Sequence, residues 1–329
     1  MNRISADIVA DSLNKYGQRL TTFVLLFPRI VLAEFNTHRM LSRNSASSRA
    51  IPFKKMIEKV KKEPFIPIAW QKEHSGMQGT EYFEEQSTEA RLLKDLWLEA
   101  RDVAVSKAEA MSSWGVTKQV VNRLLEPFLY HTCICTASEW ENFFSLRADG
   151  AAEIHIQDLA FKMLEAYNAS EPKHLKAGEW HIPFGDTIDE LKLHRACLSF
   201  REPSIRTNDL VNFDWEKIAR EAKKDTEEWK VKIATARCAR VSYLNFEGKD
   251  DYDTDIKLHD RLINSGHCSP AEHCAQAMDE EQINSESFNY DDGDNGTWGW
   301  SGNFRGFIQY RKTLVGENRK DNRVIFKTI

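Results

Sequence analysis

One short stretch of the chain gathers side chains that bind anions. Residues 38–49 read HRMLSRNSASSR and hold three arginines, a histidine, an asparagine and four serines. Arginine donates charge-assisted hydrogen bonds in a fixed fork, and serine and asparagine add hydroxyl, amide and backbone donors around the same anion. The residues that can line one wall of a pocket are Ser42, Asn44, Ser47 and Arg49. The position of the stretch, directly after a strongly apolar segment, favours a site for a phosphate-bearing ligand over a solvated loop.

Two other stretches carry reactive residue types with weaker patterns. Residues 266–274 read GHCSPAEHC, which offers two histidines and two cysteines, yet their spacing matches no zinc finger or ribbon. We therefore expect a structural histidine pair and no metal. Asn142 and Arg147 lie five residues apart beside an apolar helix face, a pattern that by itself is typical of a polar helix edge.

The elements that must position these residues follow from hydrophobic periodicity. The apolar run 19–27 predicts a buried strand, and Pro28 suits the first turn of a helix over 28–38. Residues 89–111 give the clearest helix, whose expected apolar stripe consists of Leu92, Leu93, Leu96, Trp97, Ala100, Val103 and Ala104. Further helices are expected at 52–63, 116–127, 138–147, 152–167 and 253–266, a strand at 129–137, and an irregular loop at 65–82.

These elements predict an α+β fold, a helix-rich mixed domain around a small antiparallel or mixed sheet. We divide the chain into an N-terminal part, 1–169, an irregular connecting segment punctuated by prolines, 170–228, and a C-terminal part, 229–329, which together form one catalytic domain. The acidic stretch 279–296 is expected to be an exposed loop or a lid.

Composition excludes several classes of protein. The 329 residues carry 45 basic and 50 acidic side chains, a balance that disfavours non-specific coating of nucleic acid. No apolar stretch is long enough to span a membrane, and the polar N-terminus does not resemble a signal peptide. Six scattered cysteines without a CxxC pair indicate reduced thiols and a cytoplasmic protein.

Taken together, the three stretches resemble a flavin-dependent thymidylate synthase. That family's signature is R-H-R-x-x-S-x-N-x-x-S-x-R, and residues 37–49 match it at every fixed position except Thr37. The segment NFFSLRADGA (142–151) resembles the family's N-F-x-x-L-R-x-x-x-A. The stretches ARVSY (239–243) and GHCSPAEH (266–273) resemble two further motifs, the second usually H-x-S/T-P-F-E-H.

The order of these motifs differs from the usual one, because the signature precedes ARVSY and HCSPAEH here. We interpret this as a circular permutation, similar to a longer, phage-type branch of the family, and permutation is compatible with neighbouring surface termini. The resemblance implies the family fold, a homotetramer with shared active sites, and a location in the cytoplasm, or the host cytoplasm if a phage encodes the chain.

The resemblance also implies a reaction. The family converts dUMP to dTMP, with methylenetetrahydrofolate as carbon donor and reduced FAD as hydride source, regenerated by NADPH, and it uses no cysteine nucleophile. The implied partners are therefore dUMP, the folate and NADPH, with no nucleic acid and no membrane. The protein's own contribution would be to align and polarise the uracil ring.

Residue roles carry over position by position. The implied catalytic residues are Arg147, which would stabilise the ionised uracil, and Ser47. The implied dUMP contacts are Glu34, Ser45, Ser47, Ser48, Arg49, Arg123, Arg147 and Gln309. The implied FAD contacts are His38, Arg39, Ser42, Asn44, Asn142, His267 and Ser269.

Some positions depart from the family pattern. Glu34 stands where a glutamine usually meets the nucleotide, Ser45 where glutamate is common, and Thr136 where a flavin-binding asparagine is usual. Glu153 and His155 fall in the family's A-Q-x-E-I segment. The C-terminal stretch GFIQYRK offers Gln309 and Lys312 as replacements for the missing amide and charge.

These departures leave two alternatives open. One is a related enzyme of changed specificity, such as a pyrimidine hydroxymethylase or a flavoenzyme that methylates uridine in RNA. The other is a non-catalytic nucleotide binder on the same scaffold.

Overall fold

The computed structural model describes residues 3–76, 79–201, 215–241, 251–284 and 299–314. Contacts divide the chain into two compact units. Unit 1 comprises residues 1–11, 21–172 and 240–246, and unit 2 comprises residues 12–20, 173–239 and 247–329. The mixed helix and sheet architecture expected from the sequence is confirmed. None of the helices in the described ranges is long and apolar enough to cross a membrane.

The sheet of unit 1 is built on long apolar strands. β2 (Arg19–Pro28) pairs antiparallel with β4 (Tyr130–Ala137), and β3 (Ser42–Ser45) pairs antiparallel with the other edge of β4. The strand order is β3-β4-β2-β1-β5. Residues 12–14 of β1 (Ser5–Asn14) and β5 (Lys173–Leu175), which pair parallel, are assigned to unit 2. Both strands predicted from the apolar runs are therefore present.

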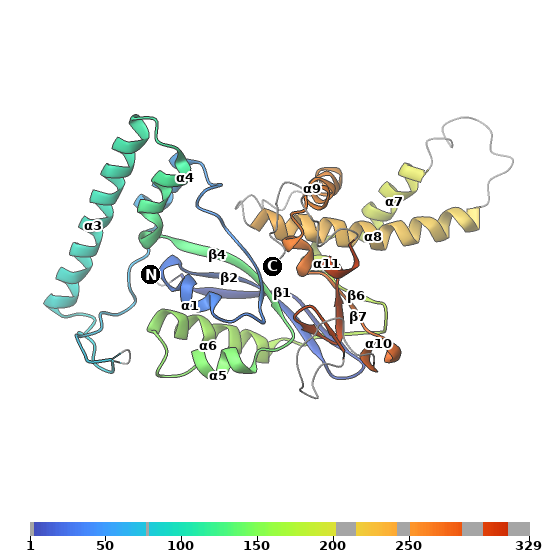
Figure 1. Cartoon of the computed structure of the whole chain (residues 1–329), viewed down its shortest axis with the longest axis horizontal. Helices are drawn as coiled ribbons and strands as arrows, with labels where there is room; N and C mark the ends of the chain where they lie inside the picture. The colour runs from blue at the N-terminus through green and yellow to red at the C-terminus, as the bar shows by residue number, and fades with distance from the viewer. Residues whose placement is uncertain (1–2, 77–78, 202–214, 242–250, 285–298, 315–329) are drawn as a thin grey trace, which may run out of the picture. The chain divides into compact units, whose positions relative to one another are not determined.

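Two helices cover this sheet and close its core. α5 (Glu141–Arg147) and α6 (Ile154–Ala169) lie against the strands in Figure 1. The core between them contains Phe23 and Phe27 of β2, Trp140 and Phe143 around α5, and Leu159 of α6, all almost fully buried. Burial of aromatic side chains of this size, with the edge-on contact of Phe23 and Trp140, fixes α5 on the sheet.

A second core in unit 1 lies among helices. It joins α2 (Phe53–Lys62), α3 (Thr88–Ser113), α4 (Lys118–Val121) and the 3-10 helix η2 (Asn122–Phe128). The short helix η1 (Arg29–Val31) and α1 (Leu32–Asn36) follow β2 directly. Pro28 thus ends the strand and precedes the helix, because its missing N–H is tolerated at both places.

The stripe predicted for α3 is only partly a buried face. Trp97 and Ala104 pack against the helical core, but Leu92 is 58% exposed and Val103 is 59% exposed. The prediction was wrong for these outer residues. α3 packs against the other helices of unit 1 along a narrow strip around Val105 and Ala108, so Leu92 and Val103 stay exposed.

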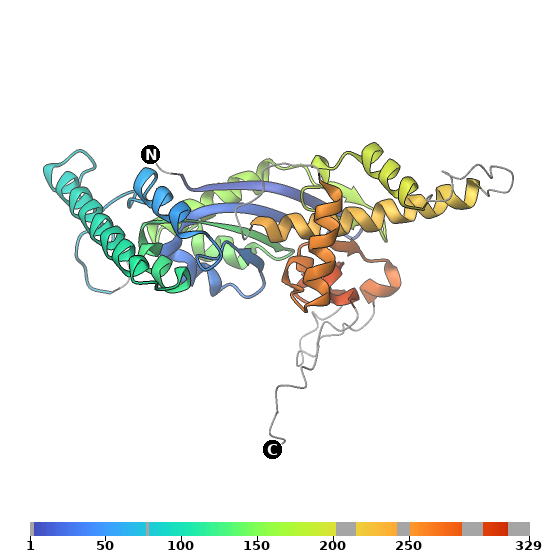
Figure 2. The ribbon, with the colours of Figure 1, turned by 90° about the horizontal axis from the view of Figure 1, so that it is seen from above.

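Unit 2 contains a three-stranded sheet of order β10-β7-β6 and a small hairpin. The strands are β6 (Trp180–His181), β7 (Ala275–Ala277) and β10 (Phe307–Gln309), and the hairpin pairs β8 (Trp300–Ser301) with β9 (Phe304–Arg305). Its helices are η3 (Gly185–Thr187), α7 (Glu190–Arg201), α8 (Trp215–Val241), α9 (Tyr252–Asn264), η4 (Ser269–Glu272), α10 (Glu280–Asn284) and α11 (Tyr310–Thr313). Figure 2 shows α8, in yellow, crossed by α9, in orange.

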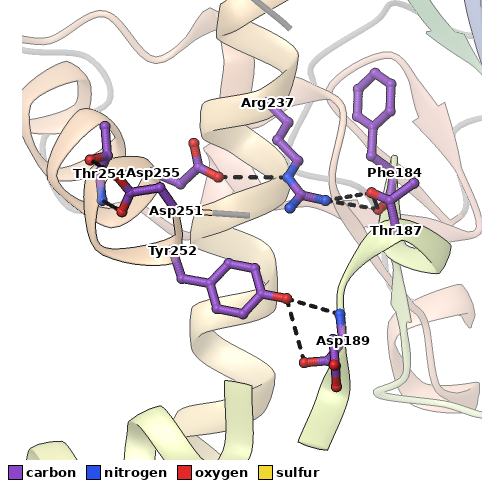
Figure 3. Close-up of polar contacts among 8 residues, drawn as sticks. All are labelled: Phe184, Thr187, Asp189, Arg237, Asp251, Tyr252, Thr254 and Asp255. Atoms are coloured by element: carbon purple, nitrogen blue, oxygen red, sulfur yellow. Dashed lines mark hydrogen bonds and ion pairs between the residues drawn. The ribbon is translucent and has the colours of Figure 1, made fainter. Parts of the chain in front are cut away.

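A buried ion pair ties α8 to α9. Arg237 and Asp255 have side chains only 3% exposed, and Nε of Arg237 lies 3.6 Å from Oδ2 of Asp255 (Figure 3). The same guanidinium donates to Thr187 and, at 3.5 Å, to the carbonyl of Phe184, whose φ of 59° is left-handed. Because a buried charge is costly unless it is paired, this cluster fixes the turn at η3 against both helices.

Residues 202–214 of the predicted connecting segment 170–228 lie outside the described residues, and the rest of it is less irregular than predicted. It contains β5, β6, α7 and the first half of α8. Pro172 and Pro183 lie between these elements, so they separate regular structure and do not prevent it. Residues 285–296 of the predicted acidic loop lie outside the described residues, and residues 280–284 form α10.

Candidate active site

Two motifs that lie far apart in the sequence meet at one contact in unit 1. Nε of Arg147, the last residue of α5, donates to Nε2 of His38 at 2.9 Å. A terminal nitrogen of the same guanidinium donates to the hydroxyl of Thr37 at 3.3 Å. The ring of His38 also meets Phe143 edge-on, with centroids 4.9 Å apart. The structure therefore joins the start of the 38–49 stretch to the NFFSLR segment.

The environment of His38 keeps its imidazole neutral. The residue is only 9% exposed, and burial lowers the pKa of His38 below 6.5, helped by the nearby charges of Arg147 and Arg43. Because Arg147 can only donate, Nε2 of His38 must accept and Nδ1 carries the proton. The contact thus presents fixed positive charge from arginine beside a neutral ring, an arrangement that stabilises negative charge on a bound ligand.

The middle of the stretch forms the short strand β3. Ser42 and Asn44 of β3 are buried, and Arg43 and Ser45 between them are half-buried. Arg43 donates to the carbonyl of Phe35 at 3.0 Å and lies over its ring. Pairing with β4 imposes this alternation because neighbouring side chains of a strand point to opposite faces.

The end of the stretch is held by the helical segment α4–η2. Ser48 donates to the carboxylate of Glu126, and Arg49 donates to Oε1 of Gln119 at 3.0 and 3.2 Å. The buried amide of Asn122 donates to the carbonyls of Ser48 at 2.7 Å and Ile51 at 3.0 Å. Backbone and side chains of residues 48–51 are therefore fixed before any ligand binds.

Sequence reasoning did not identify the three residues that anchor this end. Gln119, Asn122 and Glu126 are spaced by three and four residues, so they lie on one face of a helical segment. That spacing was a usable signal, since it places three polar groups on one side of the helical segment. Arg123, a predicted nucleotide contact, lies on the surface with Arg39 and Asn142.

Cysteine chemistry is disfavoured at this site. The hydroxyl of Ser45 lies 3.5 Å from Sγ of Cys133, on the paired strand β4. Burial raises the pKa of Cys133 to about 11, although the bond from Ser45 acts in the opposite direction. Burial likewise raises the pKa of Cys135. Since a thiol must ionise to act as a nucleophile, neither cysteine is poised for that role at neutral pH.

Two acidic residues that depart from the family pattern have different environments. Oε2 of Glu34 is buried without a hydrogen-bond partner in the described part of the chain. Glu153, by contrast, caps the N-terminus of α6, accepting from the backbone of His155 and Ile156. His155 bonds to Glu153 through Nδ1 and accepts from the backbone of Ile68 at 3.0 Å through Nε2. Glu34 is therefore open to a ligand donor, and Glu153 and His155 serve the structure.

The remaining predicted contacts lie in unit 2. His267 is exposed and bonds Ser265 at 3.0 Å, and Ser269 begins η4 on the surface. Gln309 is buried, and its amide donates to Asn303 at 3.1 Å. His273, also in this motif, is fully buried, and burial lowers its pKa to about 3. Among the described residues no group of three or more His, Cys, Asp or Glu side chains is placed to hold a metal ion.

Comparison with known proteins gives one family and a set of weak structural likenesses. The family described as "Thymidylate synthase complementing protein" matches residues 19–173. Similar solved structures include a UMP/dUMP methylase, PolB, from Streptomyces cacaoi, bound with 5-Br UMP or with 5-Br dUMP. They show 16% identity and TM-scores of 0.40 and 0.41, and cover 51% of this chain and 89% and 90% of theirs. No curated protein sequence matches significantly.

The matched segment contains the 38–49 stretch, the helical anchor at 119–126 and Arg147. The contact between His38 and Arg147 lies wholly inside it. The motifs ARVSY and HCSPAEH lie outside it, so the permuted order stays a prediction. Residues 19–173, just under half of the chain, are thus similar to the flavin-dependent thymidylate synthase family.

Proposed function

We propose that the chain is a thymidylate synthase that converts dUMP to dTMP with methylenetetrahydrofolate, FAD and NADPH. The observation that supports this most is the contact between His38 and Arg147. His38 and Arg147 lie 109 residues apart in the sequence, and a shared ligand site explains why their two motifs meet at the guanidinium of Arg147.

The nucleotide would bind along the second half of the 38–49 stretch. Ser47, Ser48 and Arg49 would take the phosphate, with Arg123 as a second cation, and Arg147 would face the uracil ring. Within the described ranges, the side chain of Arg49 bonds to the neutral amide of Gln119 and to no carboxylate, so its positive charge stays available to a phosphate. Fixed donors of this kind need little reorganisation when the ligand arrives.

The flavin would bind beside the first half of the stretch. A neutral His38 and the exposed amide of Asn142 offer donors for a polar ring edge, next to the charge of Arg147. The proposed contacts are His38, Arg39, Ser42, Asn44 and Asn142, with His267 and Ser269 from unit 2. When bound, FAD supplies the hydride for the reaction.

The reaction balances with the proposed components. The C5 proton of dUMP leaves, the methylene carbon is transferred from the folate, and a hydride completes the methyl group, releasing tetrahydrofolate and consuming NADPH. The protein's residues would orient dUMP and stabilise negative charge on its ring through Arg147, without a thiolate.

The decisive experiment is the mass of the nucleotide product. Purified protein with added FAD is incubated with dUMP, methylenetetrahydrofolate and NADPH, and each component is omitted in turn. A gain of one methyl group that depends on all components is expected. Unmodified dUMP from protein with bound FAD would overturn the proposal.

Glu34 favours a second candidate, an enzyme of changed specificity. A buried carboxylate oxygen without a partner accepts hydrogen bonds only, whereas the usual glutamine both donates and accepts. A ligand with an extra donor, such as a 2′-hydroxyl or an exocyclic amine, would satisfy this oxygen. The test is to compare UMP and dCMP with dUMP in the same assay. A product with a hydroxymethyl group, or a preference for UMP or dCMP over dUMP, would favour this candidate. If Glu34→Gln restored the preference for dUMP, the changed specificity would be assigned to Glu34.

We also propose that the enzyme is a homotetramer in the cytoplasm, with active sites shared between subunits. Sedimentation equilibrium of the FAD-loaded protein would measure the mass of the assembly, and a monomer that turns over dUMP would contradict the shared site.

A further inference from the structure

Unit 1 contains a small hollow that shares only Ser48 with the contacts proposed for the reaction. It lies where η1 and α2 meet the start of β4, and its cavity volume is about 30 Å³. The polar groups along its wall are Arg29, Ser48, Lys59, Glu126, Tyr130 and His131. Apolar side chains, among them Ile51 and Met56, form the rest of the wall.

The buried end of the hollow presents an unused hydrogen-bond donor. His131 is only 4% exposed, and its Nε2 has no partner among the described residues. A terminal nitrogen of Arg29 lies 3.3 Å from Nδ1 of His131. Because a guanidinium can only donate, Nδ1 accepts and the proton resides on Nε2. His131, a residue of the hollow's wall, therefore has a buried N–H donor without an acceptor among the described residues, which is costly in a folded protein.

His131 keeps this donor neutral over the physiological range. Burial, together with the charge of Arg29, lowers the pKa of His131 to about 3. The ring packs edge-on against Phe27, with centroids 5.4 Å apart, which fixes the direction of the N–H. The donor is thus rigid and does not change its protonation between pH 5 and pH 8.

The charges along the wall leave positive charge unmatched. Of the described residues that line the hollow, Glu126 alone is acidic, and it is engaged by Ser48 and by Arg29 at 3.7 Å. Lys59 has no carboxylate of its own there. Burial lowers the pKa of Lys59, and nearby Arg3 and Lys55 lower it further against the opposing effect of Glu63. An anion in the hollow would relieve repulsion among these cations.

We propose that this hollow binds a small oxyanion, a phosphate or carboxylate group, that accepts from Nε2 of His131 and is neutralised by Lys59 and Arg29. Arg29, Lys59 and His131 have no role in the proposed thymidylate synthesis, so the two proposals can fail separately. Ser48 links them, because its hydroxyl faces Glu126 in the hollow and its neighbour Arg49 belongs to the proposed phosphate loop.

The test follows the imidazole signals of His131 by NMR in full-length protein labelled with ¹⁵N-histidine. Inorganic phosphate is titrated at constant ionic strength, with chloride as the control salt, and acetate is titrated separately. A saturable shift of the Nε2–H signal, assigned with His131→Gln, is expected. Lys59→Met should weaken the binding about tenfold, the loss expected for one charge-assisted contact. Lys55→Met is the matched control, since this lysine of the same helix does not line the hollow, and it should leave binding nearly unchanged.

The source of the oxyanion is resolved by competition. Displacement of bound phosphate by dUMP, but not by deoxyuridine, would identify the ligand as the phosphate of the nucleotide. Phosphate that stays bound when dUMP is added would identify a separate small anion, and a response to acetate alone would identify a carboxylate. No shift of the His131 signal with either anion up to about 50 mM would overturn the proposal, as would equal weakening by Lys59→Met and Lys55→Met.

Discussion

Replacement of Arg147 by alanine is expected to lower the turnover of dUMP by about 10²- to 10³-fold, the effect of removing one preorganised donor from developing negative charge. The structure supports this magnitude because the guanidinium is fixed in advance. Nε is bonded to His38 at 2.9 Å and a terminal nitrogen to Thr37 at 3.3 Å, so the charge is already oriented. Alanine removes both the charge and these two tethers.

The assay measures kcat at saturating dUMP and, separately, the stoichiometry of bound FAD from its absorbance. FAD binding is expected to survive, since several other residues share it. A second measurement reports the local electrostatics. The charge of Arg147 lowers the pKa of His38, so Arg147→Ala should raise that pKa, while burial keeps it below 6.5. Arg91→Ala, the same change at an exposed arginine of α3, is the control and should alter neither quantity.

Two results would refute the reasoning. Turnover within about threefold of the parent enzyme, with FAD bound, would show that Arg147 does not act on the transition state. An unchanged pKa of His38 would show that the contact does not form in solution. Loss of FAD from the variant would contradict the assignment of Arg147 to the uracil and move it to the flavin.

Three other changes have defined outcomes. Arg49→Ala should raise the Kd of dUMP by about 10- to 100-fold, because it removes a charge-assisted contact worth about 1.5–3 kcal/mol, and kcat should change little. A calorimetric titration that gives the same Kd as the parent protein would contradict the phosphate role. Arg237→Met should lower the free energy of unfolding, measured by urea titration, by about 3 kcal/mol, because Asp255 then stays buried without this cation. An unchanged urea midpoint would show that the ion pair does not contribute to stability. Stability should also fall below pH 6.5. The pKa values of His131 and His273 are lowered to about 3, so as the pH falls these side chains take up protons in the unfolded chain before they do so in the folded protein. Each histidine should therefore lower the free energy of unfolding by about 2 kcal/mol at pH 5 relative to pH 7. Equal urea midpoints at pH 7 and pH 5 would refute this.

Periodicity located the elements with a strong signal of their own. The apolar run in β2 and the amphipathic pattern of α6 are local properties, so both were predictable from the sequence. β3 was not, because Ser42–Ser45 have little intrinsic preference for strand and become one only by pairing with β4. The exposure of Leu92 on α3 depends on which neighbours reach that helix, which no local pattern records.

The candidate site was predictable where a motif carried it. His38 and Arg147 were both assigned to ligands, although their direct contact was not foreseen. The anchors Gln119, Asn122 and Glu126 were missed because polar residues in a helix are usually solvated, and only the fold brings them to the 48–51 segment. The ligand roles assigned to His38 and Arg147, and to Gln309 and Ser269, all stay predictions.

The short strand β3 has a consequence for the 38–49 stretch. Replacing one residue in this stretch should be tolerated better than inserting or deleting one. Ser42 and Asn44 point inward and Arg43 and Ser45 outward because four residues face four partners on β4. Deleting one residue there would exchange the two sets, placing a guanidinium in the core and the buried hydroxyl in solvent. Swapping one small polar residue for another changes a single contact. The fixed number of residues between the signature positions is therefore required by the pairing of β3 with β4 as well as by the ligands. Insertions and deletions in this stretch should be selected against even in a relative that has lost activity.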